Sequence, residues 1–153
     1  MNKNIDFKRI ILPIDGSKYS LRAAKKALSL AKETGIDVTA IHVFQIPTNV
    51  YSTAISDKHP HTSSAYIKDI TKSMKKNGMS LLDKIVKMGS DLGVKVKKEL
   101  VEGIPDDEII KLANKNDLII MGYKGHSALG RILVGSVSEK VLHHSDAAVI
   151  IVR

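Results

Sequence analysis

Apolar residues in this chain follow two alternating patterns. Short continuous apolar runs are typical of strands buried in a parallel sheet, whereas apolar residues at every third or fourth position are typical of amphipathic helices. The strand pattern covers 9–14, 38–44, 94–101, 117–121 and 147–152. The helical pattern covers 17–35, 67–92, a segment that opens at Pro105, and 136–144. Because the two patterns alternate, we predict a doubly wound α/β fold around a parallel sheet of five strands.

Turn-forming residues mark where several of these elements should begin and end. Ser17 is a candidate N-cap of the first helix, and Gly35 is a candidate for its C-terminal stop. Gly89 and Gly93 are expected to weaken or end the second helix. The stretch 45–63 contains two prolines, one of them Pro60, and several serines and threonines, so a mobile connection is predicted there.

The composition narrows the class of protein. A length of 153 residues, with 43% hydrophobic and 26% charged residues, is typical of one globular domain, which we place at 1–153. No segment approaches the roughly 20 apolar residues of a membrane helix, and the N-terminus lacks the apolar core of a signal peptide. The absence of cysteine excludes a disulfide framework and a thiolate metal site. We therefore expect a cytoplasmic protein.

The chain is basic, with a formal net charge of +8 from 24 Lys+Arg and 16 Asp+Glu residues. Much of the excess lies within 67–98, which has little arginine or aromatic residue beside its lysines to read bases. A solvated helix face therefore explains these lysines better than nucleic-acid binding does. They are Lys68, Lys72, Lys75, Lys76, Lys84, Lys87, Lys95, Lys97 and Lys98.

A glycine-rich segment after the strand pattern at 117–121 carries the clearest chemistry. Gly122 and Gly125 are followed by Gly135 and Ser136 in the spacing G-x2-G-x9-G-S, where the last helical pattern begins. A strand, a glycine-rich loop and a helix N-terminus in this order direct backbone N–H groups at phosphate. We expect these glycines to adopt positive φ and to let a ligand approach the main chain. The segment therefore predicts a nucleotide phosphate site.

Other motifs are absent or have simpler explanations. The chain has no GxxxxGK[ST], and residues 15–18 after the first strand contain no GxGxxG. Acidic residues at 106–108 suit the N-terminus of a helix, and His42 on a strand is interpreted as structural. The remaining histidines lack the partners of a closed metal site. Those considered are His59, His61, His143 and His144.

The chain resembles the ATP-binding branch of the universal stress protein family, whose signature is G-x2-G-x9-G followed by Ser or Thr. The resemblance implies a five-stranded parallel sheet in the order 3-2-1-4-5. In such sheets ligands bind outside the carboxyl ends of the strands where the order reverses, between strands 1 and 4. Asp15 follows the first strand and Gly122 the fourth, so both are expected at this crevice. Other segments that fit the family are 10–15, 41–43, 103–105, 117–122 and 145–152.

The loop after the fourth strand and the start of the last helix are expected to hold the phosphates. Gly122 and Gly125 would let the loop wrap the ribose and phosphates. The first N–H groups of the helix and the hydroxyls of Ser136 and Ser138 would donate to phosphate. The alternative is that the glycines form ordinary turns and that Ser136 is a plain N-cap. The candidate cations are Lys124, His126 and Arg131.

The rest of the predicted site holds the nucleoside. Asp15 is too acidic to contact phosphate, so it should bind a ribose hydroxyl, the adenine edge or a metal, unless it merely starts a helix. The resemblance implies that Val43 gives adenine main-chain hydrogen bonds and that Pro13 and Met121 form apolar walls. The predicted nucleotide-binding residues are Pro13, Asp15, Val43, Met121, Gly122, Lys124, Gly125, His126, Gly135, Ser136, Val137 and Ser138.

These features predict an ATP-binding regulatory protein of the stress response whose nucleotide acts as a switch. ADP and AMP would share the adenine and ribose contacts, and Mg²⁺ or Mn²⁺ should bridge phosphate oxygens because no dedicated metal cage is visible. The alternative is slow Mg-dependent ATPase or phosphotransfer chemistry, for which His126 is the candidate to orient water and no catalytic residue is assigned. The resemblance implies a homodimer through the edge strand 147–152. The sequence does not identify the downstream protein partner.

Overall fold

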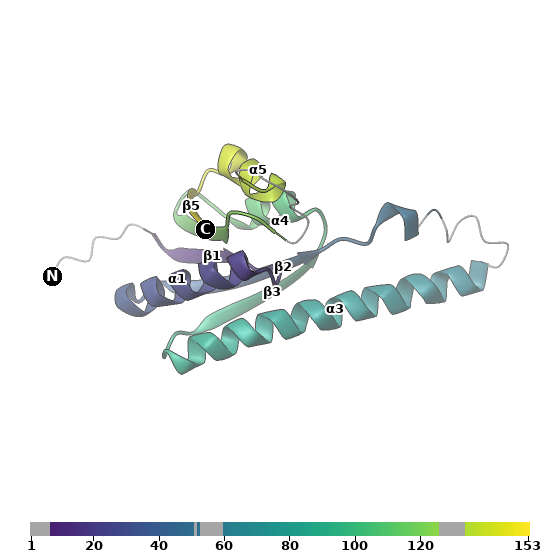
Figure 1. The fold of residues 1–153 in the computed structure, drawn as a ribbon, viewed down its shortest axis with the longest axis horizontal. Helices are drawn as coiled ribbons and strands as arrows, with labels where there is room; N and C mark the ends of the chain where they lie inside the picture. Colours follow the sequence, from purple (N-terminus) through teal and green to yellow (C-terminus); the bar gives the residue numbers. More distant parts are fainter. Residues whose placement is uncertain (1–6, 51, 53–59, 126–133) are drawn as a thin grey trace.

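The computed structural model describes residues 7–50, 52, 60–125 and 134–153, whose strands form one sheet (Figure 1). The strands are β1 (Arg9–Pro13), β2 (Asp37–Phe44), β3 (Val96–Glu102), β4 (Asp117–Gly122) and β5 (Ala148–Val152). Neighbouring strands are parallel, in the order β3-β2-β1-β4-β5. The predicted α/β fold and the strand order implied by the resemblance are confirmed.

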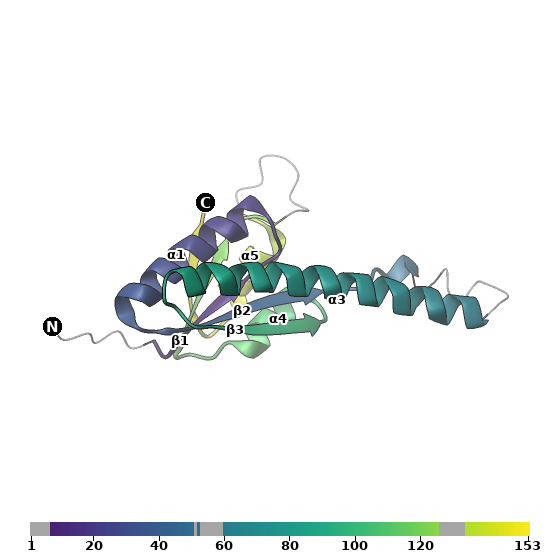
Figure 2. The ribbon, with the colours of Figure 1, turned by 90° about the horizontal axis from the view of Figure 1, so that it is seen from below.

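Helices cover both faces of this sheet. They are α1 (Lys18–Thr34), α3 (Pro60–Asp91), α4 (Pro105–Leu112) and α5 (Ser136–His144). α1 and α3 lie on one face, and α4 and α5 lie on the other (Figure 1). α3 also extends well beyond the end of the sheet (Figure 2). None of the helices in the described ranges is long and apolar enough to cross a membrane.

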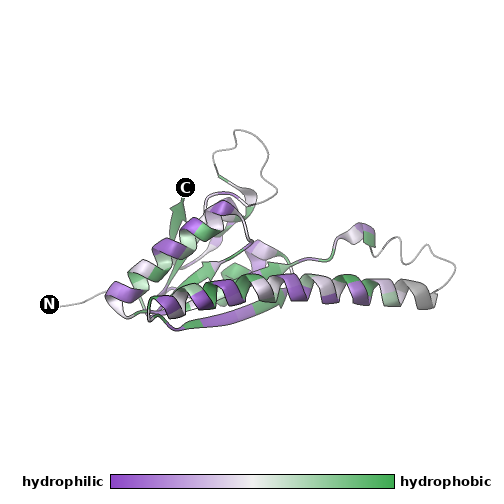
Figure 3. Cartoon of the chain, turned by 60° about the horizontal axis from the view of Figure 1, so that its bottom comes forward, coloured by the Kyte–Doolittle hydropathy of each residue, from purple (hydrophilic) through white to green (hydrophobic). Residues whose placement is uncertain are grey.

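The central strands contribute side chains to two cores. Ile10 and Leu12 of β1 pack with Leu82 on the face covered by α1 and α3. Ile11, between them in sequence, packs with Val141 on the face covered by α4 and α5. Because successive strand residues point to opposite faces, burial of both faces requires continuous apolar runs. Figure 3 shows the contrast between these hydrophobic strands and the banded polar and apolar surfaces of α1 and α3.

The ends of the helices follow the predicted signals except at the start of α3. Ser17 Oγ accepts a hydrogen bond from Ser20 N at 3.1 Å, and Gly35 ends α1 with a φ of 74°. Gly93 follows α3 with a φ of 73°. The predicted connection through residue 63 is too long, because α3 already begins at Pro60. Proline suits a first helical turn, where its missing N–H is not needed. Residues 51 and 53–59 of that connection lie outside the described ranges.

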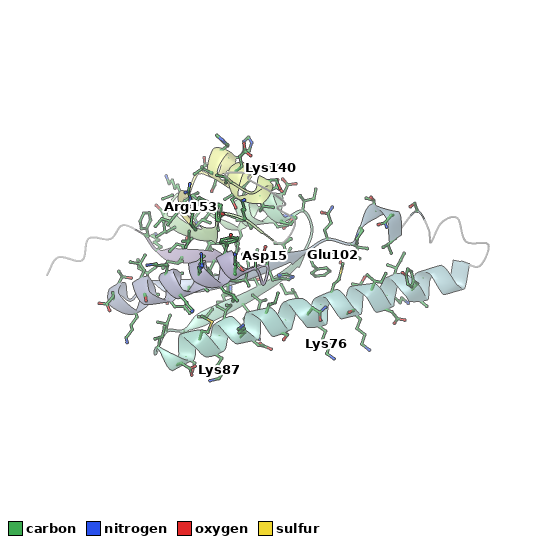
Figure 4. The ribbon with its side chains drawn as sticks, viewed as in Figure 1. Asp15, Lys76, Lys87, Glu102, Lys140 and Arg153 are labelled. Atoms are coloured by element: carbon green, nitrogen blue, oxygen red, sulfur yellow. The ribbon has the colours of Figure 1, made fainter. Side chains whose placement is uncertain are left out.

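α3 packs closely on the sheet along one side and carries its lysines on the other. A Cβ atom on Gly78 would lie 2.5 Å from His42 Cδ2. His42 Nδ1 lies 2.7 Å from the carbonyl oxygen of Ile14, so His42 has the predicted structural role. Lys76 and Lys87 point away from the sheet (Figure 4). The lysines of α3 therefore form an exposed helix face, as the sequence indicated.

Candidate functional site

A cavity of about 360 Å³ opens beyond the carboxyl ends of β1 and β4. The chain leaves β1 toward α1 on one face and leaves β4 toward α5 on the other, which creates a crevice between these neighbouring strands. All predicted site residues within the described ranges line it, whereas His126 and Arg131 lie outside those ranges. The lining residues are Pro13, Ile14, Asp15, Ser20, Ile41, Val43, Pro105, Ile109, Met121, Gly122, Lys124, Gly125, Gly135, Ser136, Val137 and Ser138.

The signature glycines allow close packing. A Cβ atom on Gly122 would lie 2.7 Å from the carbonyl carbon of Tyr19. A Cβ atom on Gly135 would lie 3.2 Å from the Cα atom of Lys124. One on Gly125 would lie 2.6 Å from Asp15 Oδ2. None of the three has a positive φ. The expectation of positive φ at these positions is therefore wrong, because what excludes a side chain here is the close approach of neighbouring segments.

Hydrogen bonds hold the two ends of the glycine-rich loop together. Gly135 N donates to the Tyr123 carbonyl at 2.6 Å, and Ser138 Oγ donates to the Gly122 carbonyl at 2.8 Å. Ser138 is buried. Its hydroxyl proton is thus used within the protein, which leaves its backbone N–H for the predicted contact with phosphate. These bonds place the start of α5 beside the end of β4.

α5 begins at the cavity without a side-chain cap. Its N-cap is Gly135, whereas α1 is capped by the Ser17 side chain. Ser136 is the first helical residue, so the interpretation of Ser136 as a plain N-cap is wrong. The N–H groups of Ser136, Val137 and Ser138 have no acceptor within the helix, and all three residues line the cavity. With the helix dipole they make this end of the cavity suitable for an anion.

At another wall of the cavity, β2 continues past the end of β1. Ile14 N donates to Ile41 O at 2.8 Å, so the backbone groups of Ile41 point toward β1. Val43 lies two residues further along β2 and therefore has the same orientation. Because β1 ends at Pro13, the N–H and C=O of Val43 face the cavity instead of a neighbouring strand.

Asp15 takes part in the turn before α1 and also lines the cavity. Its Oδ1 accepts a hydrogen bond from Ser17 N at 2.9 Å, which fixes the turn before α1. Its carboxylate also lines the cavity, where Oδ2 faces Gly125. The backbone of the α1 N-cap residue thus holds this carboxylate in place, and the second carboxylate oxygen is directed toward Gly125 of the glycine-rich loop.

A tyrosine pair lies beside the base of the loop. The rings of Tyr19 and Tyr123 meet edge to face with centroids 4.6 Å apart, and Tyr123 OH donates to Tyr19 OH at 3.4 Å. This hydrogen bond lowers the pKa of Tyr19 and raises the pKa of Tyr123. Lys124 Nζ lies 5.2 Å from the Tyr123 ring centroid. The lysine predicted to balance phosphate charge therefore contacts an aromatic ring in this structure.

The chain matches known proteins along nearly its whole length. The family model described as the universal stress protein family matches residues 6–153. The chain belongs to this family. Among its relatives, the universal stress protein MJ0531 of Methanocaldococcus jannaschii is 38% identical over 149 residues, which cover 96% of this chain and 82% of the relative.

Solved structures share the fold of this universal stress protein. The structure of MJ0577 from Methanocaldococcus jannaschii has a TM-score of 0.75 and 30% identity, and the match covers 97% of this chain and 96% of MJ0577. A universal stress protein solved in complex with cAMP has a TM-score of 0.64 and 23% identity. That match covers 96% of this chain and 97% of the other. The α/β architecture described above is therefore that of the family.

Sequence reasoning missed part of the cavity wall of this universal stress protein. Pro105 and Ile109 line it from the first turns of α4. Their spacing of four residues indicates one helix face, but nothing local shows that this face covers the end of β2. Ile14 and Ile41 had a weaker signal, since they sit near the ends of the first two strand patterns. No sequence signal marked Ser20, which lies in the first turn of α1 and lines the cavity from there.

Proposed function

We propose that this universal stress protein binds an adenine nucleotide, with ATP as the principal ligand, between the carboxyl ends of β1 and β4. The bound nucleotide would set the protein's conformation or its choice of partner. The observation that carries the proposal is the uncapped N-terminus of α5, which opens onto the cavity through three consecutive N–H groups. A single domain over 1–153 and a cytoplasmic location belong to the same proposal.

The phosphates would lie at the α5 end of the cavity. Hydrogen bonds from N–H groups to a charged acceptor contribute about 1.5–3 kcal/mol each, so the first turn of α5 suffices for a strong anion contact. Gly122 and Gly125 let the end of β4 and the loop pack closely against Tyr19 and Asp15 beside this anion site. Lys124 would exchange its contact with the Tyr123 ring for one with phosphate. ADP and AMP would use the same nucleoside contacts but fewer of the phosphate contacts.

The adenine would lie against the exposed edge of β2. The N–H and C=O of Val43 match the N1 acceptor and the N6 amino donor of adenine. Pro13, Met121 and Ile109 supply apolar surfaces for the faces of the base. Support for this choice of base comes from the universal stress protein of the same fold that was solved with cAMP.

The proposed role is binding, in which the protein holds the nucleotide without efficient hydrolysis. Across the described ranges, no group of three or more His, Asp or Glu side chains could hold a metal ion. Mg²⁺ or Mn²⁺ would therefore be held mainly by phosphate oxygens and water, with the Asp15 carboxylate nearby. Slow ATPase or phosphotransfer activity is the alternative, and His126, its candidate for orienting water, lies outside the described residues.

Identification of the bound ligand tests the proposal. One sample of purified protein is denatured at once, and a second is denatured after prolonged incubation of the native protein with Mg²⁺. The small molecules released from each sample are identified by mass spectrometry. We expect an adenine nucleotide, with ATP recovered intact after the incubation. Conversion of the ATP to ADP would support the enzymatic alternative. If no nucleotide is released and none binds on titration, the proposal is wrong.

We also propose that β5 pairs with β5 of a second subunit to form a homodimer. The two edge strands differ in character, because the exposed residues of β3 include Lys97 and Lys98, whereas β5 reads Ala-Val-Ile-Ile-Val. Charged residues protect an edge strand from pairing, and an apolar edge favours it. Ile150 is 44% exposed although it is isoleucine, as expected for a residue that a partner covers.

Replacing Ile150 by lysine should convert the dimer to monomer, because pairing of two such edges would bury the added charges. Sedimentation velocity measures the change. Ile104→Lys is the matched control, since Ile104 is 46% exposed but lies before α4, away from the β5 edge. A dimer that persists in Ile150→Lys, or that is lost equally in both variants, would contradict pairing through β5.

A further inference from the structure

The exposed side of α1 carries positive charge along its whole length. We call it the α1 basic face, and its members are the exposed residues Lys18, Arg22, Lys25, Lys26 and Lys32. These residues lie opposite the buried side of α1, which contains Ala24 and Leu28. The helix has no acidic residue in its first turn, and its one acidic residue is Glu33 near the C-terminal end. At about 1.5 Å per residue, the face is about 21 Å long from Lys18 to Lys32.

Among the described residues, no carboxylate forms an ion pair with this face. Like charges four residues apart, such as Lys18 with Arg22 and Arg22 with Lys26, repel each other by a few tenths of a kcal/mol. The cations that do pair are Arg9, Lys87, Lys97, Lys98, Lys111 and Lys140.

At its N-terminal end the α1 basic face meets two aromatic residues, Tyr19 of α1 itself and Tyr123 from a distant part of the chain. Lys18 Nζ lies 5.0 Å and Arg22 Cζ 5.8 Å from the ring centroid of Tyr19. The ring of Tyr123, from the end of β4, packs against Tyr19 and has the guanidinium of Arg153 5.8 Å from its centroid. Figure 4 shows Arg153 at the C-terminal end of β5. Tertiary packing thus combines the aromatic and arginine residues that the lysine-rich segment 67–98 lacks.

We propose that the α1 basic face, together with Tyr19, Tyr123 and Arg153, binds single-stranded nucleic acid. Cations in a row along a helix suit the phosphate backbone, and aromatic rings at one end suit stacking with unpaired bases. A duplex keeps its base faces inside, so it could use the cations but not the rings. Lys18 is exposed and long enough to move from the Tyr19 ring to a phosphate, which would free that ring for a base.

The proposal is tested by fluorescence anisotropy with a labelled oligo(dT) of about 20 nucleotides and the full-length protein at several salt concentrations. The variant Arg22→Ala/Lys26→Ala should weaken binding at least about tenfold and reduce the salt slope by about 1.4. Its matched control is Lys72→Ala/Lys76→Ala on α3, which removes the same charge from exposed positions of equal spacing. The control should change the affinity by less than about threefold.

Substitution of the aromatic residues tests stacking separately from charge. Tyr19→Leu should weaken binding of oligo(dT) at least about fivefold, whereas Tyr66→Leu at an exposed site on α3 should leave it unchanged. If Arg22→Ala/Lys26→Ala and Lys72→Ala/Lys76→Ala lose equal affinity for oligo(dT), the proposal is overturned in favour of diffuse charge attraction. It is also overturned if duplex DNA binds more tightly than oligo(dT) does, or if Tyr19→Leu binds like the unmodified protein. Circular dichroism melts verify that every variant is folded.

Discussion

Replacement of Gly125 by valine should weaken nucleotide binding at least about a hundredfold, equivalent to about 2.8 kcal/mol, while the protein stays folded. A Cβ atom at this position would lie 2.6 Å from Asp15 Oδ2, and its near neighbours among the described residues include no backbone atom. The sheet can therefore form, but the Asp15 carboxylate must move. The two methyl groups of valine would also occupy space that the proposed phosphates need.

Isothermal titration calorimetry with ATP measures this loss, and a thermal melt measures the stability of the fold. Gly103→Val is the matched control, because its Cβ atom would also meet a carboxylate side chain, that of Glu108, 2.7 Å away at Cγ. Gly103 does not line the cavity. We expect the control to bind ATP as the unmodified protein does. Unchanged binding by Gly125→Val would show that the nucleotide does not lie between Asp15 and the loop.

The second large effect is expected at the starts of β1 and β4, at the end of the sheet opposite the cavity. Replacement of Asp117 by alanine should lower the free energy of unfolding by about 3 kcal/mol, because it leaves a partly buried arginine without its partner. The side chain of Asp117 is 2% exposed, and its Oδ2 accepts hydrogen bonds from Arg9 Nη2 at 2.7 Å and from Asn114 N at 3.0 Å. These contacts join the starts of β1 and β4 to the loop after α4.

Urea denaturation followed by circular dichroism measures the change in stability. Asp91→Ala provides the comparison, since Asp91 pairs with Lys87 on the surface of α3 and both side chains are more than half exposed. An exposed pair of this kind contributes about 0.5 kcal/mol or less. Losses of similar size in the two variants would mean that burial does not strengthen the Arg9–Asp117 pair.

The ends of α1 show how much local sequence can predict. Ser17 and Gly35 were recognised because a cap and a left-handed stop depend on residues within one turn of the helix end. The conformation of the signature glycines was predicted wrongly because it depends on contacts with residues distant in the sequence. What excludes a side chain at Gly122 is the backbone of Tyr19 on another element, and no local pattern reports that contact.

The sequence by itself determined the alternation of strands and helices, the buried strands of the sheet and the spacing of the glycine signature, because periodicity and turn chemistry act over a few residues. Only the tertiary structure decided which groups face one another. The register of β1 and β2 exposes the backbone of Val43, and the packing of α4 brings Ile109 to the same cavity. It also brought both Arg153 and Tyr19 to the ring of Tyr123, because contacts between distant residues depend on the order of strands and the layering of helices.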